Sequence, residues 1–276
     1  MSALRGRLAL WLAGCLTAVV AAGTSAQEPA QQPYKPTVGQ QGRDAVWVPT
    51  TAAMVEKMLD LAKVTPRDFL MDLGSGDGRM IIAAAKRGAR ALGVEYNPDL
   101  VEYSKQEAIK AGVGDKAAFV QGDMYAADIS KATVLALFLL PSNLEKLTSK
   151  FLDLEPGSRI VANTFWIQDW EPDERETLQD NCNNWCNALL FIIPAKVDGS
   201  WRVEKDQLSL TQKYQMVEGT LTAADGTPLT VTGRLRGDRI SLTVGQRQYD
   251  GRVNGDTIEA TSKTGGSTKF VATRTR

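Results

Sequence analysis

The chain has 276 residues, enough for one large domain or two small ones with hydrophobic cores of their own. Lysine plus arginine and aspartate plus glutamate both number 32, so the formal net charge is zero and no global field attracts nucleic acid or anionic lipid. The sequence has no histidine, which excludes Ser-His-Asp and Cys-His catalysis and histidine-ligated metal sites, and we expect no metal and no nucleic-acid partner.

The N-terminal segment has the pattern of an export signal. Arg5 and Arg7 precede an apolar stretch over residues 8–22, and small residues suited to cleavage follow it. The stretch is shorter than the ~20 residues that span a bilayer. We expect residues 1–26 to be a cleaved signal peptide that sends the protein to the periplasm and leaves no stable membrane span. The alternatives are a lipid anchor through Cys15 and an uncleaved membrane anchor.

A polar stretch and one helix come next. Residues 27–44 are rich in Gln, Pro and Gly and poor in apolar residues, which predicts a flexible linker. Thr50 or Thr51 then caps a helix in which apolar residues recur at helical spacing. These residues are Met54, Val55, Met58, Leu59 and Ala62. We interpret them as core.

The central motif of the chain is a strand followed by three alternating glycines. Residues 69–73 predict a buried strand, and Gly74-x-Gly76-x-Gly78 predicts a tight turn into a helix that runs to about residue 87. The N–H groups and positive dipole of that helix point at whatever the turn holds. The next strand, 91–95, ends in Glu95, whose carboxylate can accept two hydrogen bonds from a ribose diol. The two strand ends together predict a nucleoside site.

The spacing of the glycines indicates which nucleoside binds. The dinucleotide fingerprint is G-x-G-x-x-G, which this turn does not match. Asp72 and Asp77 beside the turn would repel a pyrophosphate but suit a cationic ligand such as S-adenosylmethionine (SAM). The stretch resembles the glycine-rich motif of class I SAM-dependent methyltransferases, with Glu95 at the position of the ribose-binding acid. A nicotinamide fold and a purely structural turn are the alternatives, and Asp77 could also cap the helix.

The elements that follow alternate between helices and strands. We expect a helix at 97–111, strands at 117–121 and 133–140, a helix at 142–154, and strands at 159–165 and 188–194. This order predicts an α/β fold with a doubly wound, Rossmann-like parallel sheet and a ligand at the carboxyl ends of its strands. The last strand would run antiparallel. The loop before it contains Cys182 and Cys186, which form either a disulfide in an oxidising compartment or two free thiols.

The C-terminal part has a different texture. Residues 197–276 contain short segments of alternating polarity separated by turn pairs such as Asp225-Gly226 and Asn254-Gly255. Strands are expected at 201–203, 208–210, 214–221, 229–236, 239–244, 248–253, 257–262 and 269–273. The chain therefore divides into residues 45–196 and a small all-β barrel or sandwich, which we interpret as a structural or partner-binding module.

The class I resemblance implies a set of cofactor contacts. The amino-acid part of SAM would be held by Asp72, Gly74, Ser75, Gly76 and Gly78. Glu95 would bind the ribose. Asp123 follows a third strand, where class I enzymes place an acid that accepts from the adenine amino group, and Met124 would line the ring. Asp123 as a plain turn residue is the alternative.

Shorter pieces of the sequence resemble a narrower family. They are Val48-Pro49-Thr50, Asp72–Arg79, Phe138–Ser142, Asn163-Thr164-Phe165 and Trp170-Glu171-Pro172. These pieces are similar to those of small protein-lysine methyltransferases of bacteria and mitochondria, which are distantly similar to Dot1. The resemblance covers about residues 45–195. It implies a seven-stranded class I sheet and a lysine acceptor on a protein substrate.

The acceptor side has weaker candidates. Ser142 and Asn163 lie at neighbouring strand ends and could orient the acceptor amine, or they could satisfy backbone groups there. Methylation of a small molecule is the alternative activity. A non-catalytic module that uses the same fold to bind a nucleoside or a partner is the alternative to an enzyme.

Overall fold

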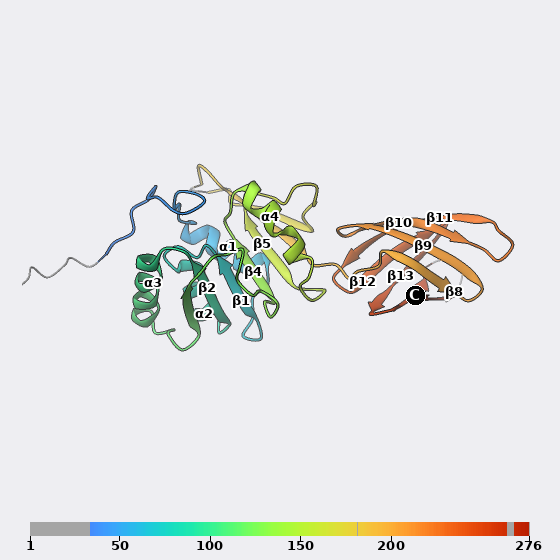
Figure 1. Cartoon of the computed structure of the whole chain (residues 1–276), viewed down its shortest axis with the longest axis horizontal. Coiled ribbons are helices and arrows are strands. Elements are labelled where there is room, and N and C mark those ends of the chain that lie inside the picture. Colours follow the sequence, from blue (N-terminus) through green and yellow to red (C-terminus); the bar gives the residue numbers. More distant parts are fainter. Residues whose placement is uncertain (1–33, 181, 264–267, 276) are drawn as a thin grey trace, which may run out of the picture. The chain divides into compact units, whose positions relative to one another are not determined.

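The computed structural model describes residues 34–180, 182–263 and 268–275 (Figure 1). The predicted signal peptide, its Cys15 and the first part of the predicted linker lie outside the described residues. Within the described ranges, none of the helices combines the length and the apolar character that a membrane crossing requires.

Seven strands form one mixed sheet in the order β3-β2-β1-β4-β5-β7-β6. Their bounds are β1 (Phe69–Leu73), β2 (Arg90–Glu95), β3 (Ala117–Gln121), β4 (Val134–Leu137), β5 (Arg159–Asn163), β6 (Glu174–Thr177) and β7 (Asn187–Ile192). Strands β1 to β5 pair in parallel, and β7 is antiparallel to both β5 and β6. The central strands are almost wholly buried, as expected for a sheet with helices on both faces. The predicted doubly wound, seven-stranded α/β fold is confirmed.

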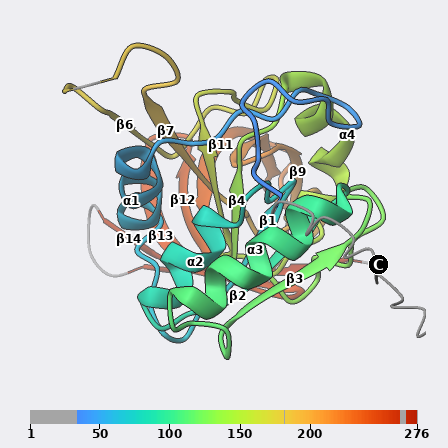
Figure 2. The same cartoon turned by 90° about the vertical axis from the view of Figure 1, so that its left-hand side faces the viewer.

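Four helices cover the two faces of this sheet. They are α1 (Ala52–Leu61), α2 (Arg79–Lys86), α3 (Pro98–Lys110) and α4 (Pro141–Phe151). The apolar faces of α1, α2 and α3 share one core cluster, and these helices lie together on one side of the strands (Figure 2). Helix α4 packs into a second cluster on the opposite face. The predicted apolar face of α1 is buried throughout.

The helix caps follow the sequence signals in two cases and differ in one. The Thr51 hydroxyl accepts from the Met54 amide, and the Asn97 side chain accepts from the Asp99 amide at 2.9 Å. Helix α2 instead begins after Gly78, which has a φ of 79° and offers no side-chain cap. Asp77, the residue before Gly78, accepts from the Arg79 backbone amide at 3.3 Å and from the Arg79 guanidinium at 2.9 Å, so it bonds the first amide of the helix from one position outside the cap.

Three differences from the predicted strands affect the sheet and the site. Strand β4 ends at Leu137, three residues early, and the freed residues 138–140 turn into the wall of a cavity. Strand β5 ends at Asn163 because Thr164 adopts a φ of 61°, outside the β region. Strand β6 was not predicted, since Glu174–Thr177 is a short, polar, largely exposed edge strand without an apolar face.

The C-terminal part is a closed antiparallel barrel of eight strands. Their bounds are β8 (Gly199–Val203), β9 (Asp206–Lys213), β10 (Met216–Thr222), β11 (Pro228–Arg236), β12 (Arg239–Val244), β13 (Arg247–Asn254), β14 (Thr257–Ser262) and β15 (Lys269–Arg274). Alternate side chains fill the interior, with Trp201 among the largest. Because the barrel is closed, it has no free sheet edge. Of the two predicted folds, barrel and sandwich, the structure has the barrel.

The loop between β5 and β6 contacts the β9–β10 turn of the barrel. The Trp170 ring stacks on Tyr214 with centroids 4.7 Å apart and planes 7° apart. The buried Gln215 amide donates to the Glu171 carbonyl at 2.7 Å. Asp173, whose side chain is 1% exposed, pairs with Arg234 at 3.1 Å. The segment Trp170-Glu171-Pro172 is therefore a structural contact with the barrel.

Candidate active site

The glycine turn, residues 74–78, is tied to the end of β2. Parallel pairing of β1 and β2 sets Leu73 opposite Val94, so both strands end at the same edge of the sheet. The Val94 carbonyl accepts from the amides of Gly74 at 2.8 Å and Ser75 at 3.1 Å. The Glu95 carboxylate accepts from the Gly76 amide at 2.9 Å. The predicted ribose-binding acid therefore lies against the turn.

Two positions in the turn require glycine. Gly76 has a φ of 54° and Gly78 a φ of 79°, in the left-handed region that side chains disfavour. A Cβ at Gly76 would lie 2.3 Å from the Trp47 indole nitrogen, and one at Gly78 would lie 2.7 Å from the Phe119 ring. Both the backbone conformation and the close packing therefore exclude larger residues.

A buried acid and an unsatisfied hydroxyl lie at the turn. Burial, together with the nearby charges of Glu95 and Asp77, raises the pKa of Asp72 to about 8. The Ser75 hydroxyl is buried and has no hydrogen-bond partner among the described residues. A cationic ligand with N–H donors would offset the clustered acids and supply the missing bonds. This corner therefore fits the ammonium group of an amino-acid ligand.

A cavity of about 350 Å³ opens beside the turn. Its volume lies in the range of small-molecule sites. The lining comes from a segment before α1, from the carboxyl ends of β1 to β5, from the loop before β7, and from α3 and α4. The lining residues are 40–48, Gly74, Val94–Asn97, Leu100, Gly122–Met124, Phe138–Leu140, Asn143, Phe165 and Trp185.

Most of the predicted cofactor residues meet at this place. Gly74, Glu95, Asp123 and Met124 line the main cavity. Asp72, Ser75 and Gly76 line a smaller space of about 50 Å³, which shares Trp47, Val48, Gly74 and Phe138 with the main one. Gly78 lines neither space and instead starts α2.

Asp123 already has a partner in this structure. Its carboxylate accepts from the Arg43 guanidinium at 2.7 Å and from the Tyr125 amide at 2.8 Å. The Tyr125 hydrogen bond, with Arg43 adding to it, lowers the pKa of Asp123. Arg43 also lies over the Tyr96 ring, 4.8 Å from its centroid. A role for Asp123 in binding adenine therefore involves exchange or sharing with Arg43.

Residues 40–48, here called the cover segment, were missed as part of the site. The sequence assigned residues up to 44 to a flexible linker, yet the segment lines the cavity and brings Trp47 against Gly76. The Trp47 amide donates to the Gln40 carbonyl at 2.9 Å, which closes the segment on itself. Val46-Trp47-Val48 is a short apolar cluster in a polar stretch, and this was the available signal.

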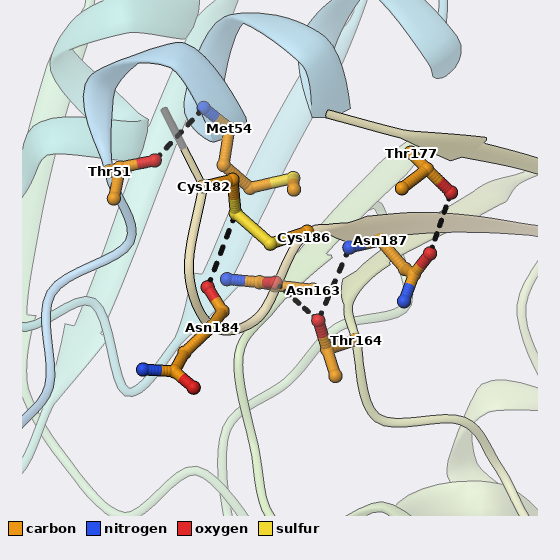
Figure 3. Close-up of a disulfide and its surroundings, with 9 residues drawn as sticks. All are labelled: Thr51, Met54, Asn163, Thr164, Thr177, Cys182, Asn184, Cys186 and Asn187. Carbon is orange, nitrogen blue, oxygen red and sulfur yellow. Dashed lines mark hydrogen bonds between the residues drawn. A yellow bond between two sulfur atoms is a disulfide. The ribbon is translucent and has the colours of Figure 1, made fainter. Parts of the chain in front are cut away.

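The two acceptor-side candidates lie beside the cavity, not in its wall. The Ser142 hydroxyl donates to the Asn143 side chain at 3.4 Å, and Asn143 is the residue that lines the cavity. Asn163 is buried and accepts from the Thr164 hydroxyl at 3.1 Å (Figure 3). Asn143 is therefore the better placed amide.

The predicted disulfide between Cys182 and Cys186 is confirmed, with the two Cα atoms 5.7 Å apart. It lies beside Asn163 and the N-terminal end of α1 (Figure 3). The loop that it closes includes Trp185, which lines the cavity. The disulfide thus belongs to the surroundings of the site.

Comparison with known proteins identifies the family. The model of the ANTKMT methyltransferase domain matches residues 72–174. A protein-lysine N-methyltransferase of Saccharolobus islandicus is 40% identical over 150 residues, which are 53% of this chain and 92% of the relative. The chain belongs to the methyltransferase family that includes this Saccharolobus islandicus relative. The barrel lies outside the matched model.

Two further relatives agree with this identification. Adenine nucleotide translocase lysine N-methyltransferase of Mus musculus is 34% identical over 128 residues, 46% of this chain and just over half (56%) of the relative. A crystal structure described as an RNA methyltransferase from Salinibacter ruber is 42% identical, with a TM-score of 0.51 over 54% of this chain and 96% of that one. It holds S-adenosyl-L-homocysteine, the product left when SAM has lost its methyl group. The protein is a SAM-dependent methyltransferase.

Proposed function

We propose that this enzyme transfers a methyl group from SAM to the side-chain amine of a lysine in a protein. The observation that carries the proposal is that an acidic cofactor corner and an aromatic cavity adjoin each other. Acids gather around the glycine turn, whereas aromatic rings and the Asn143 amide line the adjoining cavity. The relatives from Saccharolobus islandicus and Mus musculus, both named as lysine N-methyltransferases, support the same acceptor.

The residues around the turn fit the cofactor. Asp72 and Ser75 would receive the ammonium group of SAM, and Glu95 would accept from the ribose hydroxyls while the Gly76 amide holds its carboxylate in place. SAM supplies a methyl group on a positively charged sulfur, which the lone pair of the acceptor nitrogen takes as the carbon–sulfur bond breaks. The chain needs no histidine for this step, because alignment of the reacting atoms contributes most of the rate.

The aromatic lining suits an amine acceptor. A lysine must lose its proton before its nitrogen can attack, and partly desolvated surroundings lower the pKa of a lysine. Leu139, which lies against Gly74, contributes such surroundings. The rings of Phe138, Phe165 and Trp185 can attract the ammonium before it loses its proton. The Asn143 amide can orient the nitrogen by a hydrogen bond.

We also propose that the mature protein acts outside the cytoplasm. The N-terminal signal pattern and the Cys182–Cys186 disulfide both support export, since disulfides persist in oxidising compartments. Cell fractionation with sequencing of the mature N-terminus tests this. A protein that begins after residue 26 and is released by osmotic shock is expected. An uncut N-terminus in the cytoplasmic fraction would contradict it.

Acceptor class is tested with the purified mature chain and tritiated SAM. The enzyme is incubated separately with envelope proteins, with total RNA and with a small-molecule extract. We expect label in protein, and Glu95→Ala should reduce it at least tenfold at SAM concentrations below the dissociation constant, because the ribose contact is lost. Label confined to RNA or to small molecules would overturn the lysine proposal. Binding of SAM without transfer to any fraction would favour a non-catalytic module.

A further inference from the structure

Three aromatic side chains form one continuous surface in the cavity, here called the aromatic wall. The rings of Phe138 and Phe165 stack with centroids 6.0 Å apart and planes 14° apart. The Trp185 ring meets Phe138 at 5.6 Å and 67°, edge to face. All three line the cavity that Glu95 also lines. The wall therefore borders the cofactor site directly.

The sheet topology explains why the wall forms. Phe138 follows β4, Phe165 lies two residues beyond β5, and Trp185 comes just before β7. These strands are neighbours in the order β4-β5-β7, and β7 runs antiparallel to β5. The start of β7 therefore meets the ends of β4 and β5 at one edge of the sheet. Residues far apart in the sequence are brought together there.

The disulfide loop holds Trp185 in this wall. Trp185 is 41% exposed and has a φ of 56°, so neither burial nor a preferred backbone conformation fixes it. The bond between Cys182 and Cys186 closes the loop around it. The Cys186 carbonyl accepts from the Leu178 amide at 2.8 Å, and the Asn187 carbonyl accepts from the Thr164 amide at 2.7 Å. The loop is thus anchored next to β5.

The distribution of charge around the cavity favours aromatic recognition. Among its described lining residues, the carboxylates are Asp44, Glu95 and Asp123. They come from the cover segment and from the ends of β2 and β3, and Asp123 is paired with Arg43. The lining residues contributed by the ends of β4, β5 and β7 include no acid. A cation at the wall would meet aromatic rings in place of carboxylates, and the quadrupole of an aromatic ring attracts a cation.

We propose that Phe138, Phe165 and Trp185 form the subsite for the alkylammonium head of the acceptor, and that the disulfide positions Trp185 in it. This inference rests on the proposed lysine activity. Methylation enlarges the apolar surface of an ammonium and preserves its charge, so the subsite binds dimethyllysine at least as well as lysine. The acceptor side depends on the oxidised loop, whereas the cofactor side, built on β1 and β2, does not.

The test uses a probe with a cationic head and an uncharged partner of the same shape. The probe is the N-acetyl, N′-methylamide derivative of dimethyllysine, and in the partner compound carbon replaces the side-chain nitrogen. Both are titrated into the mature chain saturated with S-adenosylhomocysteine. We expect the cationic probe to bind more tightly, and Trp185→Ala to weaken its binding by roughly 5- to 30-fold, the loss of one ring face.

Two further variants test whether Trp185 must be held in place by the disulfide or need only be present. The double variant Cys182→Ser, Cys186→Ser keeps the indole but frees the loop, and we expect several-fold weaker binding of the cationic probe. Trp166→Ala is the matched control, because Trp166 is 51% exposed, does not line the cavity and contacts Arg175 instead. It should bind both compounds as the wild type does. All variants should bind S-adenosylhomocysteine with unchanged affinity, which shows that the fold is intact.

The outcomes distinguish this inference from the activity on which it rests. Equal binding of the charged and uncharged compounds, or an unchanged affinity in Trp185→Ala, would overturn the aromatic subsite even if lysine is methylated. Normal probe binding in the double serine variant would overturn the role of the disulfide. Absence of transfer to lysine, with the cation preference still measurable, would overturn the proposed function and leave the subsite standing.

Discussion

The Glu95 carboxylate spans two backbone amides, accepting from Gly76 at 2.9 Å and from Asn97 at 2.9 Å. One bond fixes the glycine turn and the other fixes the start of α3, so one side chain joins both walls of the nucleoside site. A carboxylate has about four lone-pair positions, which leaves acceptors for a ribose diol. Glu95 therefore has a structural part and a binding part.

Replacing Glu95 with alanine should weaken SAM binding by at least tenfold. The variant loses the acceptors for the ribose hydroxyls, at about 1.5–3 kcal/mol for hydrogen bonds to a charged group. Isothermal titration calorimetry with SAM measures the effect. Glu102→Ala is the control, since Glu102 is an exposed residue of α3 outside the cavity. Equal affinities for SAM in the two variants would remove Glu95 from the site.

The affinity for SAM should rise with pH up to about 8 and then fall, because the ammonium group of free SAM loses its proton near that pH. Burial raises the pKa of Asp72 to about 8, so the empty site holds a proton at neutral pH. A cationic ligand favours the ionised carboxylate, and its binding therefore releases that proton below pH 8 and releases none above it. Calorimetry at pH 7 and pH 9, in buffers of different ionisation enthalpy, counts the protons. No proton release from the wild type at pH 7 would contradict this role.

The same shift predicts a gain of stability in Asp72→Asn. The unfolded chain loses the Asp72 proton near pH 3.8, whereas the folded chain keeps it until about 8. The free energy of unfolding therefore falls as pH rises between these values, by about 1.4 kcal/mol per unit of pKa difference, and the loss is complete above pH 8. We expect Asp72→Asn to melt at a higher temperature than the wild type at pH 8.5 and to bind SAM poorly. A lower melting temperature would contradict the assignment.

Gly76→Ala should abolish SAM binding, because its Cβ would displace Trp47 as well as strain the backbone. Gly112→Ala is the control for strain alone, since Gly112 has a φ of 70° and open space around it. Both variants cost about 1 kcal/mol in backbone conformation, and the site should be damaged in Gly76→Ala alone. Calorimetry with SAM and thermal melting separate the two effects. Unimpaired SAM binding in Gly76→Ala would show that Trp47 need not pack against the turn.

Arg234→Ala should lower the free energy of unfolding by about 1–3 kcal/mol. Its partner Asp173 is a buried carboxylate, and loss of the guanidinium leaves the Ile192 amide as its remaining described hydrogen-bond donor. Arg252→Ala is the control, because it breaks an exposed pair with Asp238 that is worth at most ~1 kcal/mol. Urea unfolding of both variants gives the comparison. Equal losses of unfolding free energy in the two variants would show that the Arg234–Asp173 pair contributes no more than an exposed ion pair.

The sequence predicted those parts of the molecule that local patterns specify. The run from Phe69 to Leu73 is mostly apolar because β1 is buried on both faces. The alternating glycines after it indicate a tight turn. Asn97-Pro98 marked the start of α3 for an equally local reason. The alternating strands of the barrel follow the same logic, since inward and outward side chains differ in polarity along each strand.

The parts that were missed depend on contacts distant in the sequence. Arg43 and Trp47 lie in a polar stretch, and their roles come from Asp123 and Gly76, which the sequence does not connect to them. Trp185 looked like one residue of a long loop until the sheet brought it to Phe138. Polar strand β6 had no apolar face to reveal it.

The most direct test of the account is the identity of the atom that receives the methyl group. Envelope proteins labelled with tritiated SAM by the purified enzyme are hydrolysed completely, and the amino acids are separated against methylated standards. The account predicts radioactivity that elutes with N-methylated lysines and is strongly reduced when Glu95→Ala replaces the wild type. Radioactivity that elutes with any other amino acid, and none with methyllysine, would contradict it.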